Sequence, residues 1–180
     1  MKNIALSLAL FVSVSLIAGC GYTTSSIGGT GIKSICIEDF KNTIKVTEEP
    51  TDKRMYVPYL SGMELEVTKE VINRFLIDGN LKIKPFNQAD IILKGTLVDF
   101  KKDALRFDTS DNVTEYRLNV VVDIEAINRK TNEELWSEKH FTGESIYRMT
   151  GQYAISEQIA VRNAVDDLAE RIVERTVEAW

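Results

Sequence analysis

The stretch from residue 113 to 127 alternates between apolar and polar side chains almost without interruption. One face carries only apolar residues, namely Tyr116, Leu118, Val120, Val122, Ile124 and Ala126. On the other face, Val121 is the only apolar exception. A period of two over this length predicts a long strand with one face on a core and one face in water. A single wet face favours antiparallel neighbours over a parallel sheet buried on both sides.

The neighbours of this strand follow from the rest of the pattern. The polar link 128–132 predicts a hairpin turn into a strand from Glu134 toward Tyr147. Further strands are expected at 32–40, at 81–83 and from Ile91, the last of which can run on to Phe107. Apolar residues that recur at spacings of three and four residues predict helices over 60–78 and 154–178. We therefore expect an α+β fold with two layers: a mixed, mostly antiparallel sheet of about four strands, with two helices packed on one face.

The N-terminus has the layout of a bacterial lipoprotein signal. A basic start and a short apolar run lead to Leu16-Ile17-Ala18-Gly19-Cys20, which resembles a lipobox. The expected division is a signal peptide over 1–19, a lipidated flexible tether over 20–31 that is rich in Gly, Ser and Thr, and a single α+β domain over 32–180. Cys20 would carry a diacylglyceryl group and a further acyl chain, which suffices for lasting membrane attachment. An ordinary signal peptide or a buried apolar helix are the alternatives.

Cysteine and charge counts restrict the location and the partners. The residue after Cys20 is Gly21 rather than Asp, which favours anchoring in the outer membrane, on its periplasmic side. Removing residues 1–19 removes one lysine, so 21 basic residues face 27 acidic ones and the net charge is −6. An acidic domain is not drawn to nucleic acid by its general field. Cys36 is the only other thiol, so it is either free or bridged to another molecule.

The sequence contains no recognisable catalytic or metal-binding set. The single histidine, His140, lies on an alternating strand, where a solvated or pairing role is expected. Zinc ligands at the usual spacing are missing, and the paired carboxylates are adjacent in sequence, so they point to different sides of their elements. Nothing in the sequence indicates an enzyme or a cofactor, although an enzyme with an unrecognised site stays open.

Basic residues near strand ends are the candidate site. A guanidinium framed by apolar side chains, as in Leu105-Arg106-Phe107, suits a ligand with phosphates and acyl chains. The candidates for such contacts are Lys101, Lys102, Arg106 and Arg148. The alternative is an exposed hairpin end whose cations pair with Asp103 and Asp108.

Residues 20–180 resemble the LptE family, the lipopolysaccharide-assembly lipoproteins of the outer membrane. The resemblance rests on the order and spacing of five features: Cys20-Gly21-Tyr22, the helix end Arg74 to Gly79, the strand start Ala89-Asp90-Ile91, the Thr114-Glu115-Tyr116-Arg117 strand and the closing helix. It implies a non-enzymatic partner of the LptD β-barrel that plugs the barrel, helps it assemble and contacts lipopolysaccharide in transit. It also implies Arg106 as the basic residue linked to lipopolysaccharide. A lipoprotein serving as a binding or assembly module for a different envelope complex is the alternative.

Overall fold

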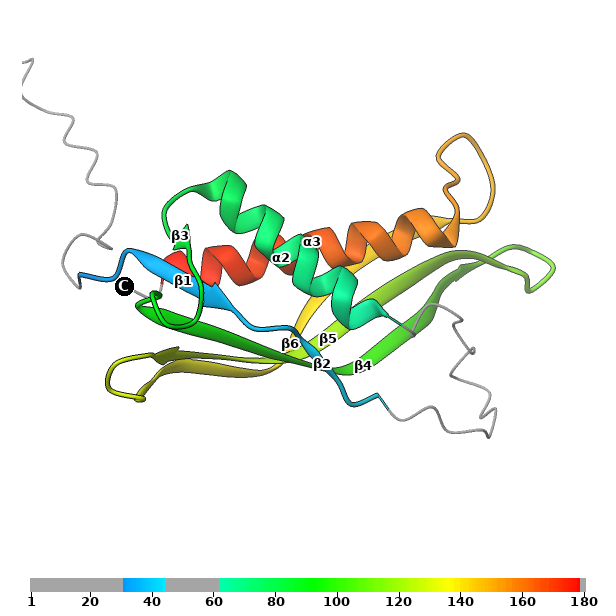
Figure 1. Cartoon of the computed structure of the whole chain (residues 1–180). Coiled ribbons are helices and arrows are strands. Elements are labelled where there is room, and N and C mark those ends of the chain that lie inside the picture. Colours follow the sequence, from blue (N-terminus) through cyan, green and yellow to red (C-terminus); the bar gives the residue numbers. More distant parts are fainter. Residues whose placement is uncertain (1–30, 45–61, 179–180) are drawn as a thin grey trace, which may run out of the picture.

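The computed structural model describes residues 31–44 and 62–178, which form one sheet covered by two helices (Figure 1). The helices are α2 (Met63–Asp78) and α3 (Glu157–Glu178). The strands are β1 (Ser34–Ile37), β2 (Lys41–Asn42), β3 (Lys82–Ile83), β4 (Ile91–Phe107), β5 (Val113–Asn128) and β6 (Glu134–Arg148). Both helices lie on the same face of the sheet, so the predicted two-layer α+β architecture is confirmed.

The sheet has six strands rather than the expected four or so. Its order is β3-β1-β4-β5-β6, with β2 also pairing β4. The three long strands are antiparallel, as predicted, whereas β1 and β2 run parallel to β4 and β1 runs parallel to β3. The single strand expected over 32–40 divides because the chain leaves the sheet near Phe40. There the Phe40 N–H donates to Thr68 Oγ1, and the Phe40 ring fills the space in which a side chain at Gly95 would lie.

The core lies between the sheet and the helices, as the alternation predicts. All six apolar residues assigned to the inner face of β5 are buried, and Val121 on the other face is buried too. The apolar residues that recur along α3 at spacings of three and four are buried as well: Val161, Ala164, Val165, Leu168, Ala169 and Ile172. The long strand and its facing are therefore confirmed.

Both helices begin three residues later than expected. Helix α2 begins at Met63 after Gly62, which has a positive φ of 87° and provides no side-chain cap. Residues 60 and 61, at the expected start of this helix, lie outside the described residues. The predicted C-terminus is confirmed, because Gly79 adopts φ 74° and its N–H bonds to Phe75 O. Helix α3 begins at Glu157 rather than near 154, since the Ser156 hydroxyl accepts the N–H of Ile159 at 3.3 Å.

Helix α3 packs very closely on β6. A Cβ added at Gly143 would lie 2.4 Å from Leu168 Cβ, so only glycine allows this approach. Directly beside it, the Glu144 N–H donates to Asp167 Oδ2 at 2.8 Å. A side chain of α3 thereby occupies a hydrogen-bonding group on the free edge of the sheet. Neither of the two described helices is long and apolar enough to cross a membrane.

Candidate functional site

A β-bulge in β4 decides where its cations point. The register with β5 shifts between Leu97 and Asp99, so one extra residue enters β4 at that point. Before the bulge the odd-numbered residues face the helices, and after it the even-numbered ones do. Lys101 therefore points to the outer face of the sheet, while Lys102 points inward toward α3. The structure separates two candidate residues that are adjacent in sequence.

Lys102 belongs to a packed cluster between β4 and α3. Its Nζ lies 2.5 Å from Glu157 Oε2 and 4.4 Å from the centroid of the Tyr116 ring, and its side chain is only 8% exposed. The Tyr147 hydroxyl donates to the same Glu157 oxygen at 3.1 Å. Burial acts to lower the pKa of Lys102, but the bonds to Glu157 and Tyr147 outweigh it, and the pKa is raised. Lys102 is thus a permanent cation that holds the hairpin to the helix, not a free ligand contact.

Arg106 and Arg148, by contrast, meet on the outer face around one carboxylate. A second bulge between Ala104 and Arg106 returns Arg106 to the outer face, opposite Glu115. Glu115 in turn faces Arg148 at the end of β6. Arg106 Nε lies 3.3 Å from Glu115 Oε2, and Arg148 Nε lies 3.8 Å from Glu115 Oε1. Because two guanidinium groups share one carboxylate, this point keeps a net positive charge.

A ligand in solution can reach the two arginines more easily than Glu115. The side chains of Arg106 and Arg148 are 67% and 49% exposed, whereas that of Glu115 is only 15% exposed. Lys101 lies on the same face and pairs with Asp99 at 3.5 Å. The ion pairs considered with Asp103 and Asp108 do not form among the described residues. Asp108 instead accepts the backbone N–H groups of its own turn, and these bonds lower its pKa.

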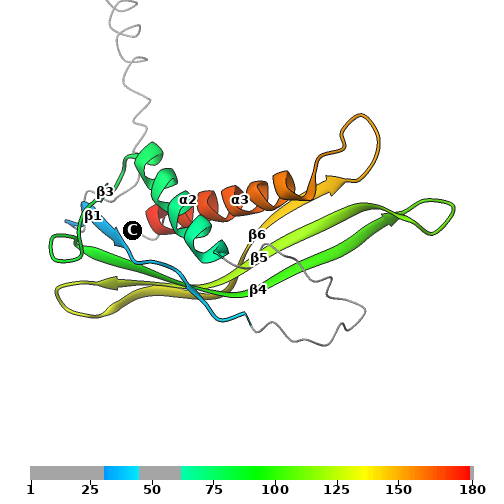
Figure 2. The same cartoon turned by 45° about the vertical axis from the view of Figure 1, so that its right-hand side comes forward.

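Exposed apolar side chains lie at the same end of the sheet as the two arginines. The ends of β4 and β6 and the loop that leads to α3 lie together at one end of the elongated sheet (Figure 2). Five large apolar residues in these segments are between 41% and 72% exposed: Leu105, Phe107, Ile146, Met149 and Tyr153. We call these five residues, with Arg106, Glu115 and Arg148, the distal surface. The sequence pointed to Leu105, Phe107 and Met149, whereas Ile146 and Tyr153 were missed because no local pattern marks them.

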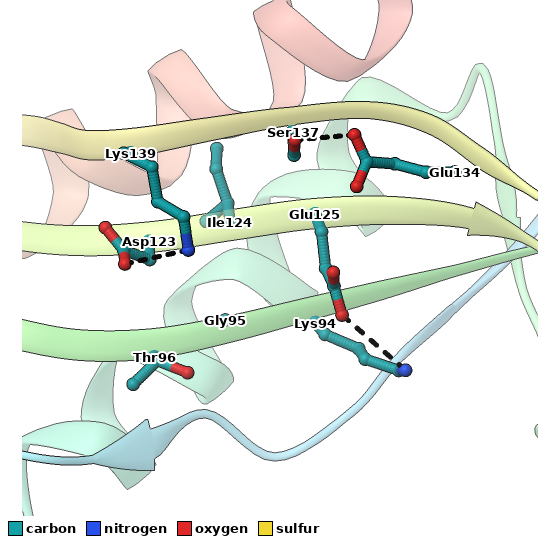
Figure 3. A pocket seen from close by; sticks show the side chains of 9 residues that line it. All are labelled: Lys94, Gly95, Thr96, Asp123, Ile124, Glu125, Glu134, Ser137 and Lys139. Atoms are coloured by element: carbon teal, nitrogen blue, oxygen red, sulfur yellow. Dashed lines mark hydrogen bonds and ion pairs between the residues drawn. The ribbon is translucent and has the colours of Figure 1, made fainter.

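A hollow on the outer face of the sheet is a weaker candidate (Figure 3). It encloses about 220 Å³ and is lined by Lys94, Gly95, Thr96, Asp123, Ile124, Glu125, Glu134, Ser137 and Lys139. Its two cations are neutralised at close range, Lys94 by Glu125 at 3.6 Å and Lys139 by Asp123 at 3.0 Å. An anionic ligand would have to displace both carboxylates, and Ile124 is the single large apolar residue in the lining.

The remaining chemically reactive residues are not assembled into a site. His140 is exposed at a bulge of β6 with φ 55°, and its backbone N–H, rather than its ring, bonds Asp123. Cys36 is a free, half-buried thiol whose pKa is raised by burial and by the charge of Glu38. Within residues 31–44 and 62–178, no group of three or more potential ligands could hold a metal ion. Cys20 lies outside the described residues.

Two solved structures share this fold at low sequence identity, and a third is less similar. A protein of Xanthomonas campestris is 12% identical with a TM-score of 0.57, covering 82% of this chain and 85% of its own. A hypothetical protein of Chlamydia trachomatis is 10% identical with a TM-score of 0.53, covering 81% of this chain and 96% of its own. The rare lipoprotein B of Shewanella oneidensis is 15% identical with a TM-score of 0.46, covering 79% of this chain and 94% of its own.

No curated protein matches the sequence. At the level of the family the result is definite, since the model described as "LptE: Lipopolysaccharide-assembly" matches residues 34–176. The match covers every strand and helix of the fold up to the last turn of α3. The chain therefore belongs to the LptE lipopolysaccharide-assembly family.

Proposed function

We propose that this protein is a non-enzymatic lipoprotein of the outer membrane, anchored through Cys20 on the periplasmic side. It plugs an LptD-like β-barrel, helps the barrel assemble and contacts lipopolysaccharide in transit through the distal surface. The observation that carries the ligand contact is the pair of exposed arginines around Glu115, set among exposed apolar side chains. Family membership supports the barrel and the transport role.

The chemistry of the distal surface matches an amphipathic phosphorylated lipid. A guanidinium group binds phosphate through two parallel N–H donors, which makes arginine suited to this ligand. The exposed Leu105, Phe107 and Met149 offer apolar area to acyl chains. The mature chain has a net charge of −6, so its general field repels an anionic lipid. The affinity must then come from cations at close range.

The four candidate cations take different parts in this proposal. Arg106 and Arg148 contact the phosphate, and Lys101, whose ammonium pairs with Asp99, is a weaker contact on the same face. Lys102 acts through the fold, because its ammonium is enclosed by Glu157 and two tyrosines. The proposed site is therefore smaller than the sequence suggested and lies on three adjacent strands.

The test is the binding of lipopolysaccharide by the purified protein and its Arg106→Glu variant. A charge-assisted hydrogen bond contributes roughly 1.5–3 kcal/mol, so the variant should bind at least about tenfold more weakly. Circular dichroism should be unchanged, since the Arg106 side chain is two-thirds exposed. Lys139→Glu is the matched control, because it reverses a charge on the same face within the hollow. Equal affinity of wild type and a folded Arg106→Glu would remove the distal surface from the ligand site.

Co-purification tests the partner separately. A mild-detergent pull-down of the tagged lipoprotein should recover an outer-membrane β-barrel, identified by mass. Arg106→Glu should leave this recovery unchanged if the barrel docks on another surface. Recovery of a different envelope complex without a barrel would favour the alternative assembly role.

A further inference from the structure

A second group of exposed apolar side chains lies at the opposite end of the sheet from the distal surface. Leu76 and Ile77 in the last turn of α2 and Phe86 in the loop after β3 are between 55% and 77% exposed. We call these three residues, with Lys82 and Lys84, the tether-side surface. The distal surface and the proposed ligand contact do not use it.

Local structure explains why these side chains point outward. The buried stripe of α2 ends at Phe75, and Gly79 terminates the helix one turn later, so Leu76 and Ile77 fall on the side away from the core. In the following extended segment, Leu81 is buried and Ile83 is half-buried, whereas Lys82 and Lys84 are exposed. Phe86 comes next on this alternation, at the start of a turn closed by bonds from the Gln88 and Ala89 N–H groups to Pro85 O.

The charge of this surface is opposite to that of the chain as a whole. Lys82 and Lys84 are exposed, and neither takes part in an ion pair within the part of the chain that the structure describes. The carboxylates closest in sequence are engaged locally. Asp78 accepts hydrogen bonds from Asn80, and Asp90 accepts them from the Lys33 N–H and Ser34. Two unpaired lysines beside exposed apolar groups suit an anionic lipid surface.

The chain enters the domain at this same end. β1 pairs with β3 in the register Ser34 to Lys82, so the first described residues lie next to the two lysines (Figure 1). About 12 residues separate Cys20 from Ile32, and a chain of that length spans at most about 40 Å. A lipid on Cys20 would keep the tether-side surface within that distance of the membrane. The local concentration of lipid surface is then high enough for weak contacts to hold.

We infer that the tether-side surface lies on the phospholipid surface next to the lipid anchor. Leu76, Ile77 and Phe86 enter the headgroup boundary, while Lys82 and Lys84 face lipid phosphates. This inference rests on the proposed anchoring through Cys20. The anchor would then do more than attach the domain to the membrane, because the contact also fixes which end of the domain faces the lipid.

The test uses the full lipidated protein reconstituted into vesicles of phosphatidylethanolamine and phosphatidylglycerol with brominated acyl chains, which quench tryptophan at the headgroup boundary. Phe86→Trp should be quenched at least about twofold more than the background from Trp136 and Trp180 in the wild type. Leu65→Trp is the matched control, because Leu65 is 61% exposed in the first turn of α2 and belongs to neither surface, so it should show only background quenching. Adding Lys82→Glu and Lys84→Glu to Phe86→Trp should reduce the quenching.

The outcomes separate the inference from the proposal on which it rests. Intact mass showing no lipid on Cys20 would overturn the anchor and with it this inference. A lipidated protein in which Phe86→Trp is quenched no more than Leu65→Trp would overturn the membrane contact alone. Quenching confined to Phe86→Trp and sensitive to both lysines would support it.

Discussion

The two arginines of the distal surface face a carboxylate of their own chain, so Glu115 should compete with an anionic ligand. Glu115→Gln removes the negative charge and keeps the size of the side chain. Because both arginines are largely exposed, each ion pair contributes only about 0.2–1 kcal/mol. Phosphate binding has to displace both of them. Removing the competitor should therefore favour the ligand by about 0.5–2 kcal/mol, which is an increase in affinity of roughly two- to thirtyfold.

The assay is calorimetric titration of the purified protein with lipopolysaccharide at two salt concentrations. The gain in Glu115→Gln should shrink at high salt, since exposed charges are screened. Glu125→Gln is the control, because Glu125 also lies on the outer face of β5 but pairs with Lys94 at 3.6 Å, far from the distal surface. Weaker binding by a folded Glu115→Gln would refute the reasoning, and would mean that the carboxylate holds the arginines in a binding arrangement.

Two further predictions concern the fold. Lys102→Met leaves the Glu157 carboxylate without its cation in a mostly buried site, so chemical denaturation should show a loss of about 2–3 kcal/mol. Adding Glu157→Gln should recover much of this loss, and no recovery would contradict the pairing. The pKa of Asp90 is lowered by bonds from the Ser34 hydroxyl and the Lys33 N–H, so its contribution to stability is present above the unfolded pKa of about 4 and is lost as pH falls through the folded pKa. Asp90→Asn should lower the melting temperature at neutral pH, and the melting temperatures of variant and wild type should converge near pH 2. A difference that stays constant with pH would contradict a role for the Asp90 charge.

The long strands were predictable in extent and facing, whereas the bounds of the short ones were not. An unbroken period of two over β5 fixes its inner face, because a slip of one residue would expose every buried side chain. The parallel strands β1, β2 and β3 span only two to four residues, which is too short for any period to show. The division of the segment expected over 32–40 into β1 and β2 was missed for this reason, although β3, the two helices and the antiparallel core of the sheet were predicted.

The observed site differs from the expected one mainly because of one bulge in β4. Val98 enters β4 as the extra residue, and since Leu97 beside it is also apolar, the sequence shows no break in pattern there. The side chains of β4 therefore face the opposite way from Asp99 to Ala104, up to the second bulge. This places Lys102 under α3, although it is adjacent to Lys101 in sequence. The meeting of Arg106 with Arg148 depends on pairing across three strands, which no local pattern in the sequence specifies.

The length of the sheet connects the two proposed surfaces. β5 has 16 residues and at about 3.3 Å per residue reaches roughly 50 Å, while the hydrocarbon core of a bilayer is about 30 Å thick. With the tether-side surface on the periplasmic leaflet, a domain directed into the membrane would bring its distal surface to the level of the opposite leaflet. The outer face of the sheet is polar and charged along this path, with Lys94, Asp123, Glu125 and Arg117 half-exposed. Such a face cannot meet hydrocarbon, so the domain can extend that far only inside a protein wall that supplies water or polar partners. The lumen of a β-barrel meets this requirement, so the length and polarity of the strands agree with the proposed plug role.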